Sequence, residues 1–274
     1  MVGIGSYDMF VDINNIIYVP NRIGSNVQVW LGGNMTHLRT ISTGLRFPKS
    51  IFAALNGDIY VDNSGSNGRI DRWTLNTTSS TIAMYVRGSC FGLFIDMNDN
   101  LYCSMDTPHQ VSKRSLYSDV NSSIIVAGNG SAGNLPSLLK GPRGIFVDIN
   151  LTLYVADCWN HRIQFFPSGQ LIGTTVPING SNGTFTLNVP TEIVFDNDGY
   201  LYIADCYNNR ILGSDAAGFR CIVGCSGLQG SASDQLSYPH SFSFDSYGNI
   251  YVIEELNNRL QKFVLLSNSC SKFH

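Results

Sequence analysis

Short stretches of alternating apolar and polar residues recur along this chain at regular intervals. Each begins with an apolar run that usually closes on Asp, continues through a polar turn, and ends on an apolar residue followed by Tyr. This pattern predicts two short antiparallel strands joined by a tight hairpin, because Asn, Asp and Gly tolerate the backbone of such turns. The copies are Phe10–Val19, Phe52–Val61, Phe94–Cys103, Phe146–Val155, Val194–Ile203 and Phe242–Val252.

The spacing of these copies predicts the architecture. Their tyrosines recur every 42 to 52 residues, and no stretch shows helical periodicity. A period in the forties with strand patterning is typical of a β-propeller with one blade per repeat. The sequence therefore predicts an all-β, six-bladed β-propeller of four-stranded antiparallel blades, forming one domain over 1–274. The expected blades are roughly 6–47, 48–89, 90–141, 142–188, 189–237, and 238–274 together with 1–5.

Each blade is expected to contain four strands in chain order. The inner strand carries the apolar run and the second carries the Tyr. The third resembles Arg162–Phe165, and the outer one resembles Ser123–Gly128. Little chain follows the last of the third strands, so we expect Met1–Gly5 to complete the sixth blade. Strand exchange between the two ends would close the ring and remove an exposed edge.

The loops after the second strands carry a recognisable motif. Asp157-x-x-Asn160-x-Arg162 and Asp205-x-x-Asn208-x-Arg210 resemble the signature of NHL-repeat proteins, a family of six-bladed β-propellers. The copy at Asn257-x-Arg259 has Glu254 in place of Asp, and the first three blades are degenerate. A catalytic role for these acids and arginines is possible. Their recurrence favours a structural role instead, in which the acid caps turn amides and the Arg ties one blade to the next.

Charge and cysteine content limit the partners and the compartment. The 17 Lys and Arg are outnumbered by 20 Asp and Glu, so a basic surface for nucleic acid is not expected. Phe263–Leu266 is apolar but too short to span a bilayer, and the amino terminus lacks signal-peptide features. Seven cysteines and seven glycosylation sequons favour an extracellular or secreted glycoprotein whose leader is not in this chain, with a cytoplasmic protein as the alternative. The sequons begin at Asn34, Asn76, Asn121, Asn129, Asn150, Asn179 and Asn182.

The positions of the cysteines suggest one disulfide. Cys90 precedes the third inner strand and Cys103 ends the next strand of that blade, so the two are expected to lie near one face and to pair. Cys221 and Cys225 flank a strand, and four extended residues would hold their Cα atoms about 13 Å apart, too far for a bridge. Each is therefore expected to pair elsewhere. The possibilities are Cys225 with Cys206 and Cys221 with Cys270.

Two enzymatic alternatives arise from related propellers. His240, in Pro239-His240-Ser241, resembles a zinc-ligand context of the peptide-amidating lyase, but the equivalent positions lack histidine and a catalytic zinc needs three protein ligands. A calcium-dependent lactonase or esterase resembles the chain in architecture alone. The strand register places Asp8, Ser50, Gly92, Gly144, Glu192 and Ser241 at the channel entrance. Asp8 and Glu192 are weak candidates for Ca²⁺, which normally takes six or more oxygens.

The favoured hypothesis is a non-catalytic module that binds a protein or glycan through one loop face. Loops between blades and between the second and third strands should converge there. The candidates are the residue types that enrich interfaces: Trp159, His161, Tyr207, Arg143 and His240. This hypothesis implies no catalytic residue, no resident cofactor and no membrane segment, and it leaves the ligand open.

Overall fold

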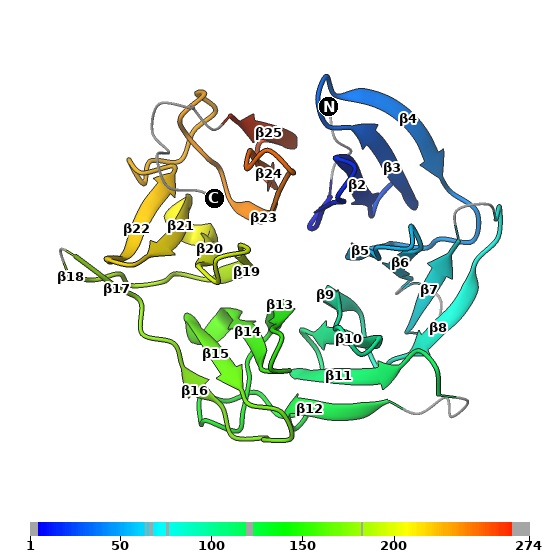
Figure 1. Ribbon diagram of the computed structural model, residues 1–274, viewed down its shortest axis with the longest axis horizontal. Helices are drawn as coiled ribbons and strands as arrows, with labels where there is room; N and C mark the ends of the chain where they lie inside the picture. Colours follow the sequence, from blue (N-terminus) through cyan, green and yellow to red (C-terminus); the bar gives the residue numbers. More distant parts are fainter. Residues whose placement is uncertain are drawn as a thin grey trace.

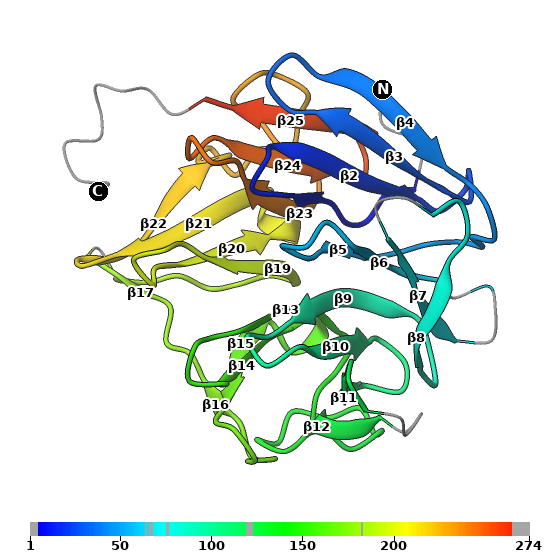
Figure 2. The ribbon, with the colours of Figure 1, turned by 45° about the vertical axis from the view of Figure 1, so that its right-hand side comes forward.

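The computed structural model describes residues 5–63, 65, 68–74, 77–118, 123–181 and 183–264. Six small antiparallel sheets stand around a common axis, and the strands of each sheet follow one another in chain order from the axis outward (Figure 1). Figure 2 shows the same sheets from the side, as a ring of tilted layers. The predicted all-β six-bladed propeller is confirmed.

The strands of the first three blades are as follows. Blade 1 contains β1 (Phe10–Val11), β2 (Ile16–Asn21), β3 (Asn26–Leu31) and β4 (Thr36–Ile41). Blade 2 contains β5 (Ile51–Ala53), β6 (Ile59–Asp62), β7 (Arg69–Trp73) and β8 (Thr81–Tyr85). Blade 3 contains β9 (Cys90–Ile95), β10 (Asn100–Met105), β11 (Gln110–Ser115) and β12 (Ile124–Gly128).

The last three blades carry the two short 3₁₀ turns. Blade 4 contains β13 (Pro142–Val147), β14 (Leu153–Asp157), η1 (Cys158–Asn160), β15 (Arg162–Phe166) and β16 (Thr174–Thr175), followed by the small hairpin β17 (Asn179–Gly180) and β18 (Gly183–Thr184). Blade 5 contains β19 (Pro190–Phe195), β20 (Leu201–Asp205), η2 (Cys206–Asn208), β21 (Arg210–Asp215) and β22 (Gly218–Val223). Blade 6 contains β23 (Pro239–Phe244), β24 (Ile250–Glu254) and β25 (Arg259–Phe263).

The Asp and Tyr of the repeat stabilise the first hairpin of a blade together. In blade 3, Asp96 Oδ1 accepts hydrogen bonds from the amides of Asn98 and Asn100, both at 2.9 Å. Its other oxygen accepts one from the Tyr102 hydroxyl at 2.9 Å. Tyr102 stands opposite Phe94 across the strand pair. The Asp and Tyr of the repeat therefore stabilise the hairpin turn and place Tyr102 beside Phe94.

The hydrophobic core is divided into wedges between neighbouring blades. One cluster joins Val27 of blade 1 to Ile51 and Val61 of blade 2, and similar clusters follow around the ring. The last cluster packs Ile17 of blade 1 against Tyr251 of blade 6, whose hydroxyl donates to the Gly32 carbonyl at 2.7 Å. Blade 6 has three strands among the described residues. The strand exchange expected for Met1–Gly5 involves residues 1–4, which lie outside that part.

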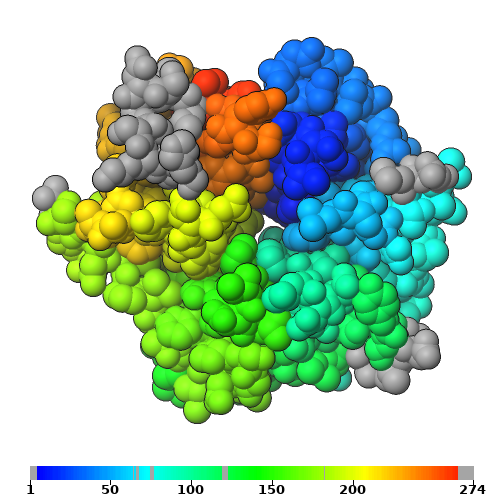
Figure 3. Space-filling view, in the orientation of Figure 1, coloured from blue at the N-terminus to red at the C-terminus, as the bar shows by residue number. Residues whose placement is uncertain are grey.

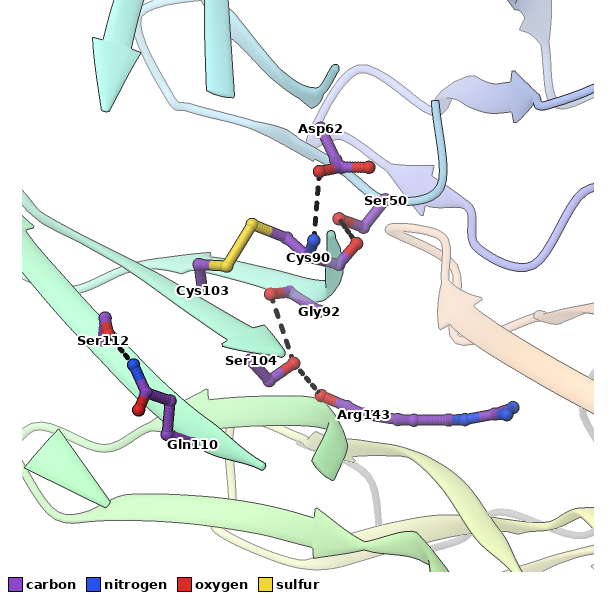
Figure 4. Close-up of a disulfide and its surroundings, with 9 residues drawn as sticks. All are labelled: Ser50, Asp62, Cys90, Gly92, Cys103, Ser104, Gln110, Ser112 and Arg143. Atoms are coloured by element: carbon purple, nitrogen blue, oxygen red, sulfur yellow. Dashed lines mark hydrogen bonds between the residues drawn. A yellow bond between two sulfur atoms is a disulfide. The ribbon is translucent and has the colours of Figure 1, made fainter. Parts of the chain in front are cut away.

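The disulfides confirm one expectation and correct another. Cys90 and Cys103 are bridged across β9 and β10 (Figure 4). Cys221 and Cys225 are also bridged, with Cα atoms 5.5 Å apart, so the pairings with Cys206 and Cys270 were wrong. The error arose from assuming an extended chain. Gly224 adopts a left-handed conformation at φ +71° and folds the chain back after Val223.

The two remaining cysteines of the described part, Cys158 and Cys206, are free and buried. Among the described residues, no helix has the length and apolar character that crossing a bilayer would require.

Replacing Cys90 and Cys103 together by alanine should lower the free energy of unfolding. Closing a loop of about this length removes roughly 3 kcal/mol of entropy from the unfolded chain. Urea titration of the two proteins measures the difference. The matched control is the Cys221→Ala, Cys225→Ala pair, which opens a much shorter loop and should lose less. Equal stability of the Cys90–Cys103 variant and the wild type would contradict the assignment.

Candidate binding site at the channel mouth

Equivalent positions near the start of the inner strands form a ring at one end of the axial channel. In several blades a Pro opens this strand, and the residue before it has a positive φ, as at Val189 (55°) and Tyr238 (53°). This conformation turns the inter-blade loop down into the strand and places the next residues at the mouth. The ring positions, one per blade, are Tyr7, Lys49, Phe91, Arg143, Thr191 and His240.

All of these except Thr191 line a single cavity of about 570 Å³. The space-filling view is hollowed where the blades meet (Figure 3). The remaining lining residues are Arg22, Trp159, Val189, Tyr207, Tyr238, Glu255 and Leu256. The cavity thus draws its lining from the ring and from the loops around it.

A cationic and aromatic cluster lies on one side of the cavity. The Lys49 ammonium is 4.2 Å from the centre of the Phe91 ring, and the Arg143 guanidinium is 5.1 Å from the same ring. Figure 4 shows Arg143 extending away from its own strand, β13. Burial lowers the pKa of Lys49. The aromatic ring of Phe91 therefore attracts both cations and helps to hold them in place.

His240 connects this cluster to Glu255. Its Nε2 is 3.3 Å from Glu255 Oε2, and its Nδ1 is 3.3 Å from Arg143 Nη1. These partners are satisfied by a neutral imidazole that donates to Glu255 and accepts from Arg143. Burial lowers the pKa of His240, and the neighbouring guanidinium lowers it further. The hydrogen bond from His240 lowers the pKa of Glu255.

Aromatic side chains from the loops also line the cavity, and we call Trp159, Tyr207 and Tyr238 the aromatic wall. Trp159 in η1 and Tyr207 in η2 occupy equivalent loop positions in adjacent blades, with their rings edge to face at 6.3 Å. Tyr207 also lies 4.9 Å from Tyr238. Trp159 is 38% exposed and Tyr207 is 42% exposed, so both rings present surface to a ligand.

The repeated loop motif serves the scaffold. Asp157 is fully buried, and its Oδ2 accepts from Arg162 Nε at 2.7 Å. The other N–H groups of Arg162 donate to the carbonyls of Asn134, Leu135 and Leu138 in the loop that enters the blade. Arg210 and Arg259 repeat this arrangement with Asp205 and Glu254. These acids and arginines are occupied by one another and by backbone, as the structural interpretation requires.

Four of the five candidate residues from the sequence come together in the cavity: Arg143, Trp159, Tyr207 and His240. His161 does not line it. Its φ is 56°, and its Nδ1 accepts from the Val189 amide at 3.0 Å, which ties blade 4 to blade 5. His109 and Asn209 make the same contact in their own blades, with Gly141 and Tyr238.

Sequence reasoning missed several lining residues, including Tyr7, Arg22 and Tyr238. A signal for Tyr7 was present, because it shares the ring position of Arg143 and His240 in the repeat.

A second tier of residues lies just below the ring. Ser241 Oγ donates to Asp8 Oδ1 at 2.8 Å, and Asp8 also accepts from the amides of Met9 and Ile51. Burial raises the pKa of Asp8 to about 7. Burial and the nearby Asp8 charge raise the pKa of Glu192. An added Cβ at Gly144 would lie 2.4 Å from Glu192 Oε1, so the crowded blade requires glycine there.

This tier brings two carboxyl groups and one hydroxyl together. No group of three or more His, Cys, Asp or Glu side chains that could hold a metal occurs in the described ranges. Of the described residues that line the cavity, His240 is the one histidine, whereas a catalytic zinc takes three protein ligands. Calcium normally takes six or more oxygens.

Comparison with known proteins agrees with this architecture. A family model described as the NHL repeat matches residues 139–166. The protein is thus a six-bladed β-propeller. It contains an NHL repeat in the stretch that spans β13 to β15. A comparison with curated proteins gave no significant match.

Similar solved structures are distant in sequence. A protein of unknown function from Bacteroides thetaiotaomicron VPI-5482 has 13% identity and a TM-score of 0.75, covering 95% of this chain and 69% of its own. Virginiamycin B lyase from Staphylococcus aureus has 15% identity and a TM-score of 0.63, with coverages of 97% and 82%. A chain of a nidogen–laminin complex has 18% identity and a TM-score of 0.59, with coverages of 77% and 76%. At these identities the likeness shows the fold alone.

The raised pKa of Asp8 predicts a pH dependence of stability. The carboxyl titrates near 3.8 in the unfolded chain and near 7 when folded, so the folded protein binds the extra proton between these values. The contribution of Asp8 to the free energy of unfolding is fully present below about pH 4. It declines as the pH rises toward 7, by at most ~1.4 kcal/mol per pH unit. For a chain of this size, that is on the order of a few degrees in Tm per unit.

Melting temperatures of wild type and Asp8→Asn between pH 4.5 and 7.5 test this prediction. The wild-type Tm should fall with rising pH relative to the variant, whose amide cannot ionise. Asp198→Asn, at an exposed hairpin position, is the control and should track the wild type. A constant difference between wild type and Asp8→Asn over the whole range would rule out the raised pKa.

Proposed function

We propose that this protein is a non-catalytic binding module that holds a protein or glycan ligand in the cavity at its channel mouth. The observation that carries the proposal is the cavity itself. Its volume of about 570 Å³ falls in the range of small-ligand sites. Aromatic rings and hydrogen-bonding cations line it together, and these residue types are enriched in binding hot spots.

The arrangement of charges supports binding over hydrolysis. The acids of the repeated loops are fixed by arginines and backbone amides, as for Asp157 and Asp205. Asp8 and Glu192 remain as the calcium-dependent alternative. Burial raises the pKa of both carboxyl groups, and the charge of a bound cation would oppose that shift. The structural neighbours include a lyase and a laminin-bound nidogen, so the fold does not choose between catalysis and binding.

An extracellular setting accords with the same features. Two disulfides are present, and bridges of this kind persist in oxidising compartments. The sequon asparagines within the described part are all exposed: Asn34, Asn129, Asn150 and Asn179. Asn76, Asn121 and Asn182 lie outside it.

Removing the aromatic wall should abolish ligand capture. We expect Trp159→Ala combined with Tyr207→Ala to recover at least ten-fold less of a ligand that the wild type retains from secreted proteins and glycans. Both substitutions remove exposed surface, so the fold should persist. Quantitative pull-down, with Tm as the folding check, measures the loss.

The matched control removes two exposed tyrosines outside the cavity. Tyr117 is 80% exposed and Tyr247 is 74% exposed, and neither lines the cavity. Tyr117→Ala with Tyr247→Ala should leave capture unchanged. Equal recovery by the wild type and the Trp159–Tyr207 variant would refute the proposed face.

A further inference from the structure

The cavity carries more positive charge than its own acid can neutralise. Its lining includes three cations, Arg22, Lys49 and Arg143, and one carboxylate, Glu255, although the whole chain has a net charge of −3. Glu255 is already engaged by His240. None of the three cations forms an ion pair with a carboxylate in the described ranges. Positive charge is therefore concentrated at this one site.

Arg143 differs from the arginines of the repeated loops in how its donors are used. Arg162 gives its N–H groups to an aspartate and to carbonyls. Arg143 Nε is buried without a hydrogen-bond partner, and Nη1 contacts only the His240 ring. Leaving a buried donor unsatisfied costs about 1–3 kcal/mol. A ligand that supplies the missing acceptor would recover that energy.

The Phe91 ring presents both cations without consuming their donors. Contact with a ring face is electrostatic and leaves the N–H groups of Lys49 and Arg143 available. Both cations line the cavity, and the guanidinium fork of Arg143 matches the two oxygens of a carboxylate, which it can bind with two parallel hydrogen bonds. The geometry thus favours a planar anion bound against Phe91.

We propose that the cavity binds an acidic saccharide, with its carboxylate on Arg143 and Lys49 and its sugar ring against Trp159 and Tyr207. This inference rests on the proposed function and names its ligand class. A cavity of about 570 Å³ falls in the range of small-molecule sites, which suits a short saccharide. The aromatic wall supplies flat apolar faces with an indole N–H or a phenol O–H at their edges, which suits a ring bearing both C–H and O–H groups.

The neighbouring acids favour a single negative charge on the ligand. Glu255 stands in the cavity, and the Asp8–Glu192 pair lies one tier below. The negative charge of Glu255 opposes a dianion such as phosphate more strongly than a monoanion. A carboxylate therefore fits better than a phosphate.

Isothermal titration calorimetry with galacturonate, a monoanion, and with its neutral methyl ester tests the proposal. The two probes differ by the charge of the carboxyl group, so the wild type should bind the acid at least ten-fold more tightly. Arg143→Gln should weaken acid binding at least ten-fold and leave ester binding nearly unchanged. Arg87→Gln, at an exposed site outside the cavity, removes the same charge and should leave both affinities unchanged. Tm confirms that each variant folds.

The other outcomes separate this inference from the proposed function. Equal affinity for acid and ester, with loss of both in the Trp159→Ala, Tyr207→Ala variant, would keep the cavity as a binding site and overturn the carboxylate assignment. Acid binding that survives both Arg143→Gln and Lys49→Met would overturn it too. Tighter binding of inorganic phosphate, or of a peptide with a free terminal carboxylate, would overturn the saccharide assignment. If neither sugar binds, the saccharide inference is overturned but the proposed function is not, because the pull-down tests the proposed function independently.

Discussion

Packing between blades is the interaction on which the whole structure depends. A sheet of four short strands leaves its faces uncovered, and the buried apolar side chains lie in wedges shared by two neighbours. The last wedge, with Ile17 and Tyr251, joins the first blade to the sixth. A blade without its neighbours would expose to water the apolar side chains that it contributes to the two wedges on either side of it. Each blade is therefore stable only as part of the ring.

Polar groups of the repeat reinforce the same contacts. Asp157 and Asp205 each bind the amide of a residue in the incoming loop, at Lys140 and Asn188, as well as an arginine of their own blade. His161 and Asn209 then fix the amide that precedes the next inner strand. The buried carboxylates of Asp157 and Asp205 are thus paired and hydrogen-bonded, which is the condition for burying a charge at tolerable cost.

The sequence predicts the fold well because its signal repeats. The Phe–Tyr hairpins and their spacing define six sheets even where the loop motif has decayed, as in blades 1 to 3. The Cys90–Cys103 bridge followed from strand direction alone. The Cys221–Cys225 bridge did not, because a single left-handed glycine reverses the chain. His161 was assigned to the binding face by loop position, whereas its side-chain direction depends on a positive φ that composition does not reveal. Arg22 was missed because the loop of its blade has lost the signature that places Trp159 and Tyr207.

The loop residues that hold the blades together differ from the residues that line the cavity, and this difference explains the position of the site. The loop acids and arginines cannot change without loosening an interface, because their partners are backbone groups of the adjoining loop. Among the ring positions at the channel mouth, Thr191 shares this role, because its hydroxyl donates to the Pro239 carbonyl of the next blade. For the five ring residues that line the cavity, the side-chain contacts described above are with other side chains. Their side chains meet across the axis, where no blade contacts its neighbour's core. Six equivalent positions hold Tyr7, Lys49, Phe91, Arg143, Thr191 and His240, six different side chains on one repeated backbone. A scaffold that is nearly symmetric thus presents an asymmetric cavity, because each blade contributes a different side chain to its lining, and one orientation of a charged ligand is favoured over the others.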